Sequence, residues 1–183
     1  MNPRDAAETI SQTAFGLHCL LIYRDLVTLR EFYSSYFQRQ INQNGTIQVM
    51  PFYETENSVR EVLSKNGKTS IDILKQVGAS LIIVDALRGY FDHGNVESIW
   101  KNIKEIVQNA EEVGKKEISI LGDAGAFFYR HQIQSLLDYE SILPLNFDIN
   151  LKGICMYHQK DFNKMSKDFQ EKILKRHSMA IMI

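Results

Sequence analysis

The sequence predicts an α/β fold, a three-layer sandwich with a mostly parallel central sheet. Three observations favour this class. Short apolar runs alternate along the chain with segments of helical periodicity. Several of these runs are almost continuously apolar, which is typical of strands covered on both faces. The segments between them are long enough for the right-handed crossovers that join parallel strands.

Six short runs rich in β-branched and aliphatic residues are expected to form the strands. In chain order they cover residues 18–23, 46–50, 81–84, 118–121, 153–157 and 179–183. The third run ends at Asp85 and the fourth at Gly122-Asp123, so polar or small residues stop each of them.

Segments with apolar residues at helical spacing lie between these runs. Asn44-Gly45 suits the C-cap of the first, Asn95 the N-cap of a helix ending near Gly114, and Pro144 follows another. The expected helices cover residues 25–43, 56–65, 71–77, 95–114, 127–143 and 166–177.

The chain has 183 residues, of which 44% are hydrophobic and 23% charged, as in a soluble globular domain. We expect residues 15–183 to form a single domain and residues 1–14 a flexible N-terminal segment. The formal net charge is −1 and no basic stripe is present, so direct nucleic-acid binding is not expected.

The two cysteines and the N-terminus bear on localisation. Cys19 and Cys155 both lie in apolar runs, which indicates core packing in a reducing compartment. No apolar run has the roughly 20 residues that span a bilayer, and residues 1–13 lack the apolar region of a signal peptide. These features predict a cytoplasmic protein that does not associate with a membrane.

Ligands of open α/β sheets bind beyond the carboxyl ends of the strands, so the residues that follow the strands are the candidate contacts. Arg24 or Arg88 would pair with an anionic group, and Asp85 and Asp123 would accept hydrogen bonds. Aromatic residues near these ends, including Phe52 and Tyr53, are expected in part to line an apolar pocket for a small organic ligand. The predicted ligand-binding residues are Tyr23, Arg24, Asp85, Arg88, Asp123 and Tyr157.

Three short motifs each allow both a ligand-binding and a purely structural interpretation. Gly67-Lys68-Thr69-Ser70 resembles the end of a phosphate-binding loop, but no strand precedes it, so we interpret it as a surface turn. The run 81–85 has the form of a Walker B strand, and its Asp85 either contacts a ligand or caps the next turn. Gly122-Asp123-Ala124-Gly125 either lets a ligand approach the backbone or simply makes a tight turn.

Two other functions remain open. A metal-dependent hydrolase would assemble Asp85, Asp123 and His158 across loops. A protein-interaction module would have no ligand at the strand ends. The sequence has no G-x-S-x-G elbow and no G-x-G-x-x-G fingerprint, so neither a serine hydrolase of the α/β-hydrolase type nor a dinucleotide cofactor is indicated. We therefore predict no cofactor, no bound metal and a non-catalytic role.

The order of segments resembles the MEDS family, the methanogen/methylotroph sensory domain, over residues 15–183. The matching pieces are residues 18–23 with the helix to Phe37, the turn at 44–46 into 47–50, 81–85, 90–94, 136–140, 154–157, 161–162 and 173–177. The chain departs from the family pattern at His158, where Asp is frequent, and at Ser178, where Pro is common.

The resemblance implies a degenerate relative of the RecA/KaiC ATPase core, without a working Walker A loop. It also implies a sensory domain that binds a small organic molecule and signals to a separate kinase or regulator, or through a homodimer. The residues agree on one point: the first strand reaches the next helix through Arg24-Asp25-Leu26, without a glycine to wrap the backbone around a triphosphate. ATP hydrolysis is therefore not expected.

Overall fold

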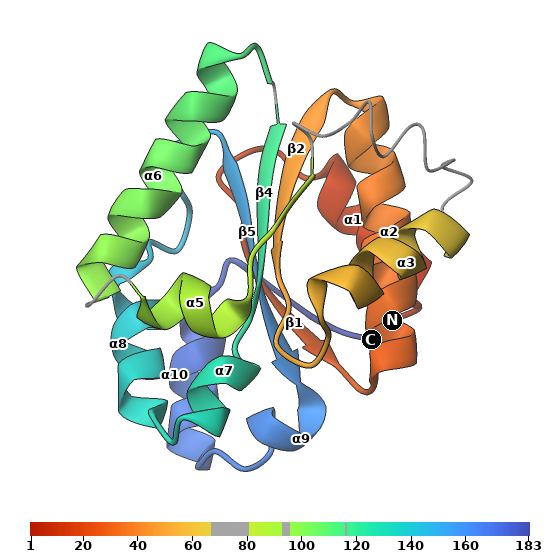
Figure 1. The fold of residues 1–183 in the computed structure, drawn as a ribbon. Coiled ribbons are helices and arrows are strands. Elements are labelled where there is room, and N and C mark those ends of the chain that lie inside the picture. Colours follow the sequence, from red (N-terminus) through yellow and green to blue (C-terminus); the bar gives the residue numbers. More distant parts are fainter. Residues whose placement is uncertain (67–80, 93–95, 116) are drawn as a thin grey trace.

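The computed structural model describes residues 1–66, 81–92, 96–115 and 117–183. Its centre is a sheet in which every strand pairing is parallel, in the order β3-β2-β4-β5-β1-β6 (Figure 1). The strands are β1 (His18–Tyr23), β2 (Gly45–Met50), β3 (Leu81–Ile83), β4 (Glu117–Asp123), β5 (Leu151–His158) and β6 (Met179–Met182). This arrangement confirms the predicted α/β sandwich with a parallel sheet.

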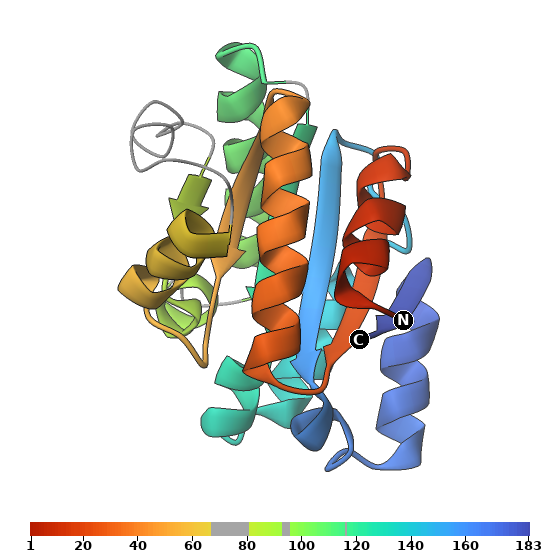
Figure 2. The same ribbon diagram turned by 90° about the vertical axis from the view of Figure 1, so that its right-hand side faces the viewer.

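Helices cover both faces of the sheet. One face carries α1 (Pro3–Gln12), α2 (Leu26–Asn42) and α3 (Glu56–Asn66), and Figure 2 shows α1 and α2 in front of the strands. The helices on the opposite face are α5 (Ala86–Phe91), α6 (Val96–Glu112), α7 (Gly125–Tyr129), α8 (Ile133–Ile142), α9 (Gln159–Phe162) and α10 (Lys167–Arg176). The glycine-lysine motif at 67–70 and the helix expected at 71–77 lie outside the described residues.

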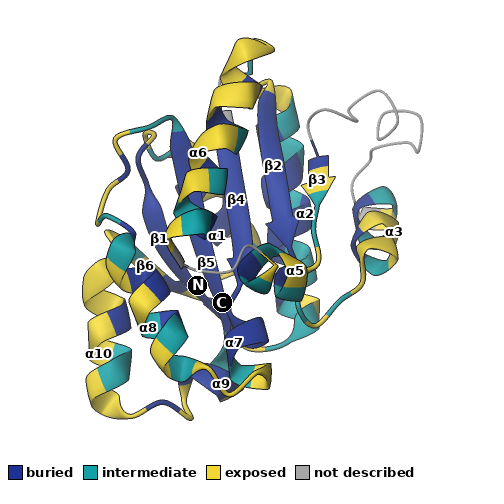
Figure 3. Cartoon of the chain, turned by 60° about the vertical axis from the view of Figure 1, so that its left-hand side comes forward, coloured by how far each residue is buried: buried dark blue, intermediate teal, exposed yellow. Residues whose placement is uncertain are grey.

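Each face of the sheet has its own hydrophobic core. Along β1, Leu21 and Tyr23 pack toward α2, whereas Leu20 and Ile22 pack toward the opposite helices. The central strands are therefore buried on both sides, as Figure 3 shows. The expectation that the apolar runs are covered on both faces fails at β3, where Ile82 is 37% exposed. The reason is that β3 is a three-residue strand at the edge of the sheet.

The helix expected over 127–143 is two helices. His131 takes a left-handed conformation with φ of 54°, and the N–H of Gln132 donates to the carbonyl of Phe127 at 2.9 Å. These features end α7 with a left-handed C-cap, and the chain begins α8 at Ile133. The short α7 lies directly beyond β4, at the end of the sheet that carries the predicted ligand residues.

The N-terminal segment expected to be flexible contains the helix α1. Asn2 accepts from the N–H of Arg4 and Pro3 begins the helix, a favourable start for a polar segment. Ala6, Ala7 and Ile10 are fully buried in the core beside α2. Small alanine side chains allow this close packing, although they give the segment little hydrophobic character in the sequence.

We expect Ile10→Val to lower the free energy of unfolding by about 1 kcal/mol, because it removes a buried methylene from the contact between α1 and the core. Urea unfolding measures this change. The matched control is Ile82→Val on the partly exposed face of β3, which should change stability by less than about 0.5 kcal/mol. Equal effects of the two variants would contradict the docking of α1.

Candidate functional site

The connections that leave the carboxyl ends of four neighbouring strands go to different faces of the sheet. The helices that follow β1 and β2 pack on one face of the sheet, whereas those that follow β4 and β5 pack on the other. Open α/β sheets bind their ligands beyond the strand ends at such a switch between faces. In the order of the sheet these four ends belong to β2, β4, β5 and β1, next to α7 and α9 (Figure 1).

Asp123 lies at the centre of this edge and is 1% exposed. Its Oδ2 accepts a hydrogen bond from the Tyr23 hydroxyl at 2.8 Å, and its Oδ1 accepts one from the N–H of Gly125 at 2.8 Å. Burial, with a smaller contribution from the neighbouring Asp161, raises the pKa of Asp123 to about 7, although hydrogen bonds from Gly125, Tyr23 and the Phe52 backbone act to lower it. This carboxyl is therefore poised to exchange a proton near neutral pH.

A second tyrosine–aspartate pair lies beside the first. Tyr53, in the segment after β2, donates its hydroxyl hydrogen bond to Oδ2 of Asp161 in α9. Oδ1 of Asp161 pairs with Nζ of Lys164 at 2.7 Å. The His158 ring lies 5.2 Å from the Tyr23 ring and 5.5 Å from the Tyr53 ring, between centroids. We call Tyr23, Tyr53, Asp123, His158 and Asp161 the strand-end cluster.

Aromatic side chains form a partly exposed rim beside this cluster. Phe52 packs on Tyr53 and on Tyr129, which are 40% and 65% exposed respectively. A Cβ atom on Gly125 would lie 2.6 Å from Phe52 and 2.7 Å from Tyr53. The glycine after Asp123 therefore lets the aromatic rim pack directly against the start of α7.

The structure brings together only two of the six predicted ligand residues, Tyr23 and Asp123. Arg24 is exposed and pairs with Asp25 at 3.0 Å. Tyr157 is buried on the opposite face of the sheet, where its hydroxyl donates to Glu140.

The other two predicted residues, Asp85 and Arg88, lie at the edge of the sheet. Asp85 caps α5 by accepting from the N–H of Arg88 at 3.1 Å, the capping alternative considered from the sequence. The Arg88 guanidinium lies 3.5 Å from Asp92 and is largely exposed. Both residues line a hollow of about 380 Å³ beside the ends of β2 and β3. This hollow is separate from the strand-end cluster.

The residues of the alternative hydrolase, Asp85, Asp123 and His158, do not come together as a ligand set. Asp85 follows β3, which is two strands from β4 in the sheet, a separation of about 10 Å. Both oxygens of Asp123 already accept hydrogen bonds, and Nδ1 of His158 accepts from the N–H of Lys160 at 3.1 Å. The geometry therefore gives no support to this metal site.

Sequence reasoning missed a group of ionisable residues inside the protein, which we call the buried cluster: His18, Glu140, Cys155 and His177. Burial, with a contribution from the nearby His177, lowers the pKa of His18 to about 3. Burial raises the pKa of both Glu140 and Cys155. The four residues lie on separate elements and form no local motif, so no spacing pattern could have revealed them.

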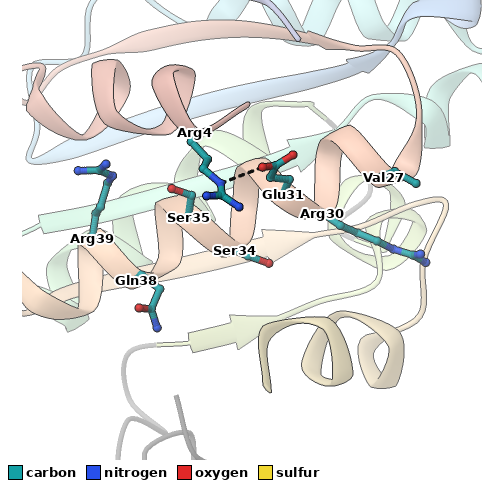
Figure 4. A pocket seen from close by; sticks show the side chains of 8 residues that line it. All are labelled: Arg4, Val27, Arg30, Glu31, Ser34, Ser35, Gln38 and Arg39. Atoms are coloured by element: carbon teal, nitrogen blue, oxygen red, sulfur yellow. Dashed lines mark hydrogen bonds and ion pairs between the residues drawn. The ribbon is translucent and has the colours of Figure 1, made fainter. Parts of the chain in front are cut away.

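A broad hollow of about 810 Å³ lies on the outer surface of α2 (Figure 4). Three arginines line it, but each is already paired within the chain. The pairs are Arg4 with Glu31, Arg30 with Glu54 and Arg39 with Glu8. Because these charges are matched internally, the hollow offers no unpaired cation to an anionic ligand.

No helix in the described ranges combines the length and the apolar character needed to cross a bilayer.

The fold and the strand-end cluster define a doubly wound α/β domain with its candidate ligand site at the carboxyl edge of a parallel sheet. A family model described as MEDS, the MEthanogen/methylotroph, DcmR Sensory domain, matches residues 17–178. The chain belongs to this family, as its resemblance to the family indicated, and the family is one of sensory domains. Among the curated proteins compared with it, none matches.

Tyr23→Phe tests the buried pair at this site. We expect the free energy of unfolding to fall by about 1–3 kcal/mol at mildly alkaline pH, because the Asp123 carboxylate loses the Tyr23 hydroxyl as a donor. The pKa of Asp123 should rise, since the lost hydrogen bond favours the ionised form. Urea unfolding and a carboxyl NMR titration measure both effects. Tyr129→Phe at the exposed rim is the control, and an unchanged Asp123 pKa in Tyr23→Phe would refute the pairing.

Proposed function

We propose that this protein is a sensory domain that binds a small organic molecule at the strand-end cluster and passes its state to a separate partner protein. The observation that carries the proposal is the pair of tyrosine–aspartate hydrogen bonds, Tyr23 to Asp123 and Tyr53 to Asp161, beyond the carboxyl ends of the central strands. Buried carboxyls with aromatic neighbours suit a ligand that has an apolar body and one polar group.

The charges at the cluster favour a ligand that donates hydrogen bonds over an anion. Asp123 and Asp161 offer acceptor oxygens, and a carboxylate ligand would be repelled by their negative charge. The arginines first considered for an anionic ligand, Arg24 and Arg88, are exposed and each faces an aspartate. Alcohols and amines with a small hydrocarbon part therefore fit this site best.

Tyr53 provides a route by which binding would change the protein surface. It is 40% exposed, and its hydrogen bond to Asp161 ties the segment after β2 to α9. A ligand hydroxyl or amine that donates to Asp161 would replace the hydrogen bond from Tyr53. Because one hydrogen bond replaces another, the change in free energy is small. The released Tyr53 and Phe52 would then present a different surface beside Tyr129 to a partner.

A thermal-unfolding screen with short-chain alcohols, amines and carboxylic acids tests the proposal. A compound that binds only the folded state raises the melting temperature. We expect an alcohol or amine to do so in the wild type and in Arg24→Ala, and to lose this effect in Asp123→Asn and Asp161→Asn. Hydrogen exchange should become faster at residues 52–54 when that compound is present.

Two results would contradict the proposal. One is a screen in which no compound of these classes stabilises the wild type, which would favour the ligand-free interaction module. The other is a stabilisation that persists in both Asn variants, which would place the ligand elsewhere.

A further inference from the structure

Four side chains with metal-binding atoms meet in the core between the sheet and helices α8 and α10. His18 comes from β1, Glu140 from α8, Cys155 from β5, and His177 follows α10. One ligand atom from each residue lies within 4.8 Å of the other three. All four side chains are buried, so this group is not one of the exposed acidic clusters that form at random on surfaces.

Three of the six distances between these atoms are close to those between neighbouring ligands of a tetrahedral metal ion, and all six are at most 4.8 Å. Nε2 of His18 lies 3.5 Å from Sγ of Cys155 and 3.7 Å from Oε2 of Glu140. Nε2 of His177 lies 3.4 Å from the same Oε2. In a tetrahedral zinc site with ordinary bond lengths, neighbouring ligand atoms are about 3.4–3.6 Å apart. The buried cluster thus needs little rearrangement to surround an ion.

Both histidines are oriented as metal ligands usually are. Nδ1 of His18 lies 3.0 Å from the carbonyl oxygen of Pro144, and Nδ1 of His177 lies 2.8 Å from that of Ile173. A ring that donates its Nδ1–H to a carbonyl keeps a free lone pair on Nε2. In both rings this Nε2 faces the buried cluster, where it could bind a cation.

Two atoms of the buried cluster lack hydrogen-bond partners despite their burial. They are Oε2 of Glu140 and Nε2 of His177, which face each other. The other carboxylate oxygen of Glu140 accepts from Tyr157, which fixes the side chain in place. Because buried polar atoms in native proteins almost always have partners, these two atoms point to a partner located between them.

We propose that His18, Glu140, Cys155 and His177 bind one divalent transition-metal ion of the zinc class in a closed structural site. Two nitrogens, a sulfur and one carboxylate oxygen suit Zn²⁺ and not Mg²⁺ or Ca²⁺, which prefer oxygen ligands. On binding, the Cys155 thiol loses its proton to solvent, and a thiolate and a carboxylate together neutralise the divalent charge.

Four protein ligands would leave no open coordination position, which is the arrangement of structural zinc sites. The ion would tie β1, β5 and α8 to the junction between α10 and β6, and so hold the C-terminal part of the chain on the sheet. A hollow of about 570 Å³ between α8 and α10 has Glu140 in its lining. This hollow provides a route for the ion, although a site this buried should load most readily during refolding.

The test uses the full chain and Zn²⁺ alone. Protein unfolded in denaturant with a chelator is refolded with or without Zn²⁺, and metal content and melting temperature are measured. We expect one zinc per chain and a higher melting temperature after refolding with Zn²⁺. Refolding with Co²⁺ should give the visible bands of a tetrahedral site and a thiolate charge-transfer band.

Cys155→Ser and His177→Gln should each weaken zinc binding at least tenfold, and Cys155→Ser should abolish the thiolate band. Cys19→Ser is the matched control. Cys19, on β1, is buried like Cys155, but it packs on the face of the sheet opposite the buried cluster. The proposal is overturned if refolded wild type holds no stoichiometric zinc, gives no cobalt bands and has the same melting temperature with and without Zn²⁺. That result would leave the buried cluster as a purely hydrogen-bonded element, and it would not affect the ligand proposal at the strand ends.

Discussion

Asp123 should contribute a loss of stability as the pH rises from about 4 to about 7, because its carboxyl ionises in the folded protein only near the upper end of this range. The folded-state pKa of this carboxyl is about 7, raised by burial from an ordinary value of 3.8. Between these two values the folded state binds more protons than the unfolded state, so stability falls with increasing pH. The slope from this one group reaches about 1.4 kcal/mol per pH unit.

Urea unfolding over this pH range, with wild type and Asp123→Asn in parallel, isolates the contribution of Asp123. Glu140, whose pKa is also raised by burial, adds a slope of the same sign to both proteins, and His18, whose pKa burial lowers to about 3, adds a slope of opposite sign to both. The difference between the two curves should therefore fall through the range and level off above about pH 7. Asp92→Asn, at an exposed position, should leave the wild-type slope unchanged. A constant difference between wild type and Asp123→Asn would show that Asp123 ionises equally in both states.

Most of the sheet could be predicted because its strands are short apolar runs between helical segments. The helices that were missed or misjudged have specific physical causes. In α1 two of the four buried residues are alanines, whose small apolar area gives the segment little hydrophobic character, and contact with α2 supplies the stabilisation. The helix α5 has only six residues, too few to show a period. The break at His131 depends on a left-handed conformation that histidine adopts infrequently.

The position of the candidate site could be predicted in part, because ligands of parallel sheets bind beyond the carboxyl ends of the strands. Tyr23 and Asp123 do lie at this edge, but the rule does not decide which face of a strand a side chain occupies. Tyr157 precedes the last residue of β5 and points to the face opposite Tyr23, a consequence of the two-residue period of a strand. Asp161 and Tyr53 come together from segments 108 residues apart, which only the fold specifies.

Glu140→Ala should be among the most destabilising single substitutions in this protein, with a loss of about 3–5 kcal/mol in the free energy of unfolding. The carboxylate is 1% exposed, accepts from the Tyr157 hydroxyl, and lies 3.4 Å from His177 and 3.7 Å from His18. Its removal leaves the buried Tyr157 hydroxyl without its acceptor and opens a cavity beside the two histidines. Such a loss is a large fraction of the stability of an ordinary domain.

Urea unfolding of three variants of α8 separates the polar contribution of Glu140 from the effect of volume. Asp138→Ala, on the exposed side of the same helix, should change stability by less than about 0.5 kcal/mol. Glu140→Gln preserves the volume and the acceptor for Tyr157, and should recover part of the loss. If Glu140→Ala and Asp138→Ala were equally mild, the side chain of Glu140 would have to reach solvent in the folded protein, and the buried cluster would not exist as described.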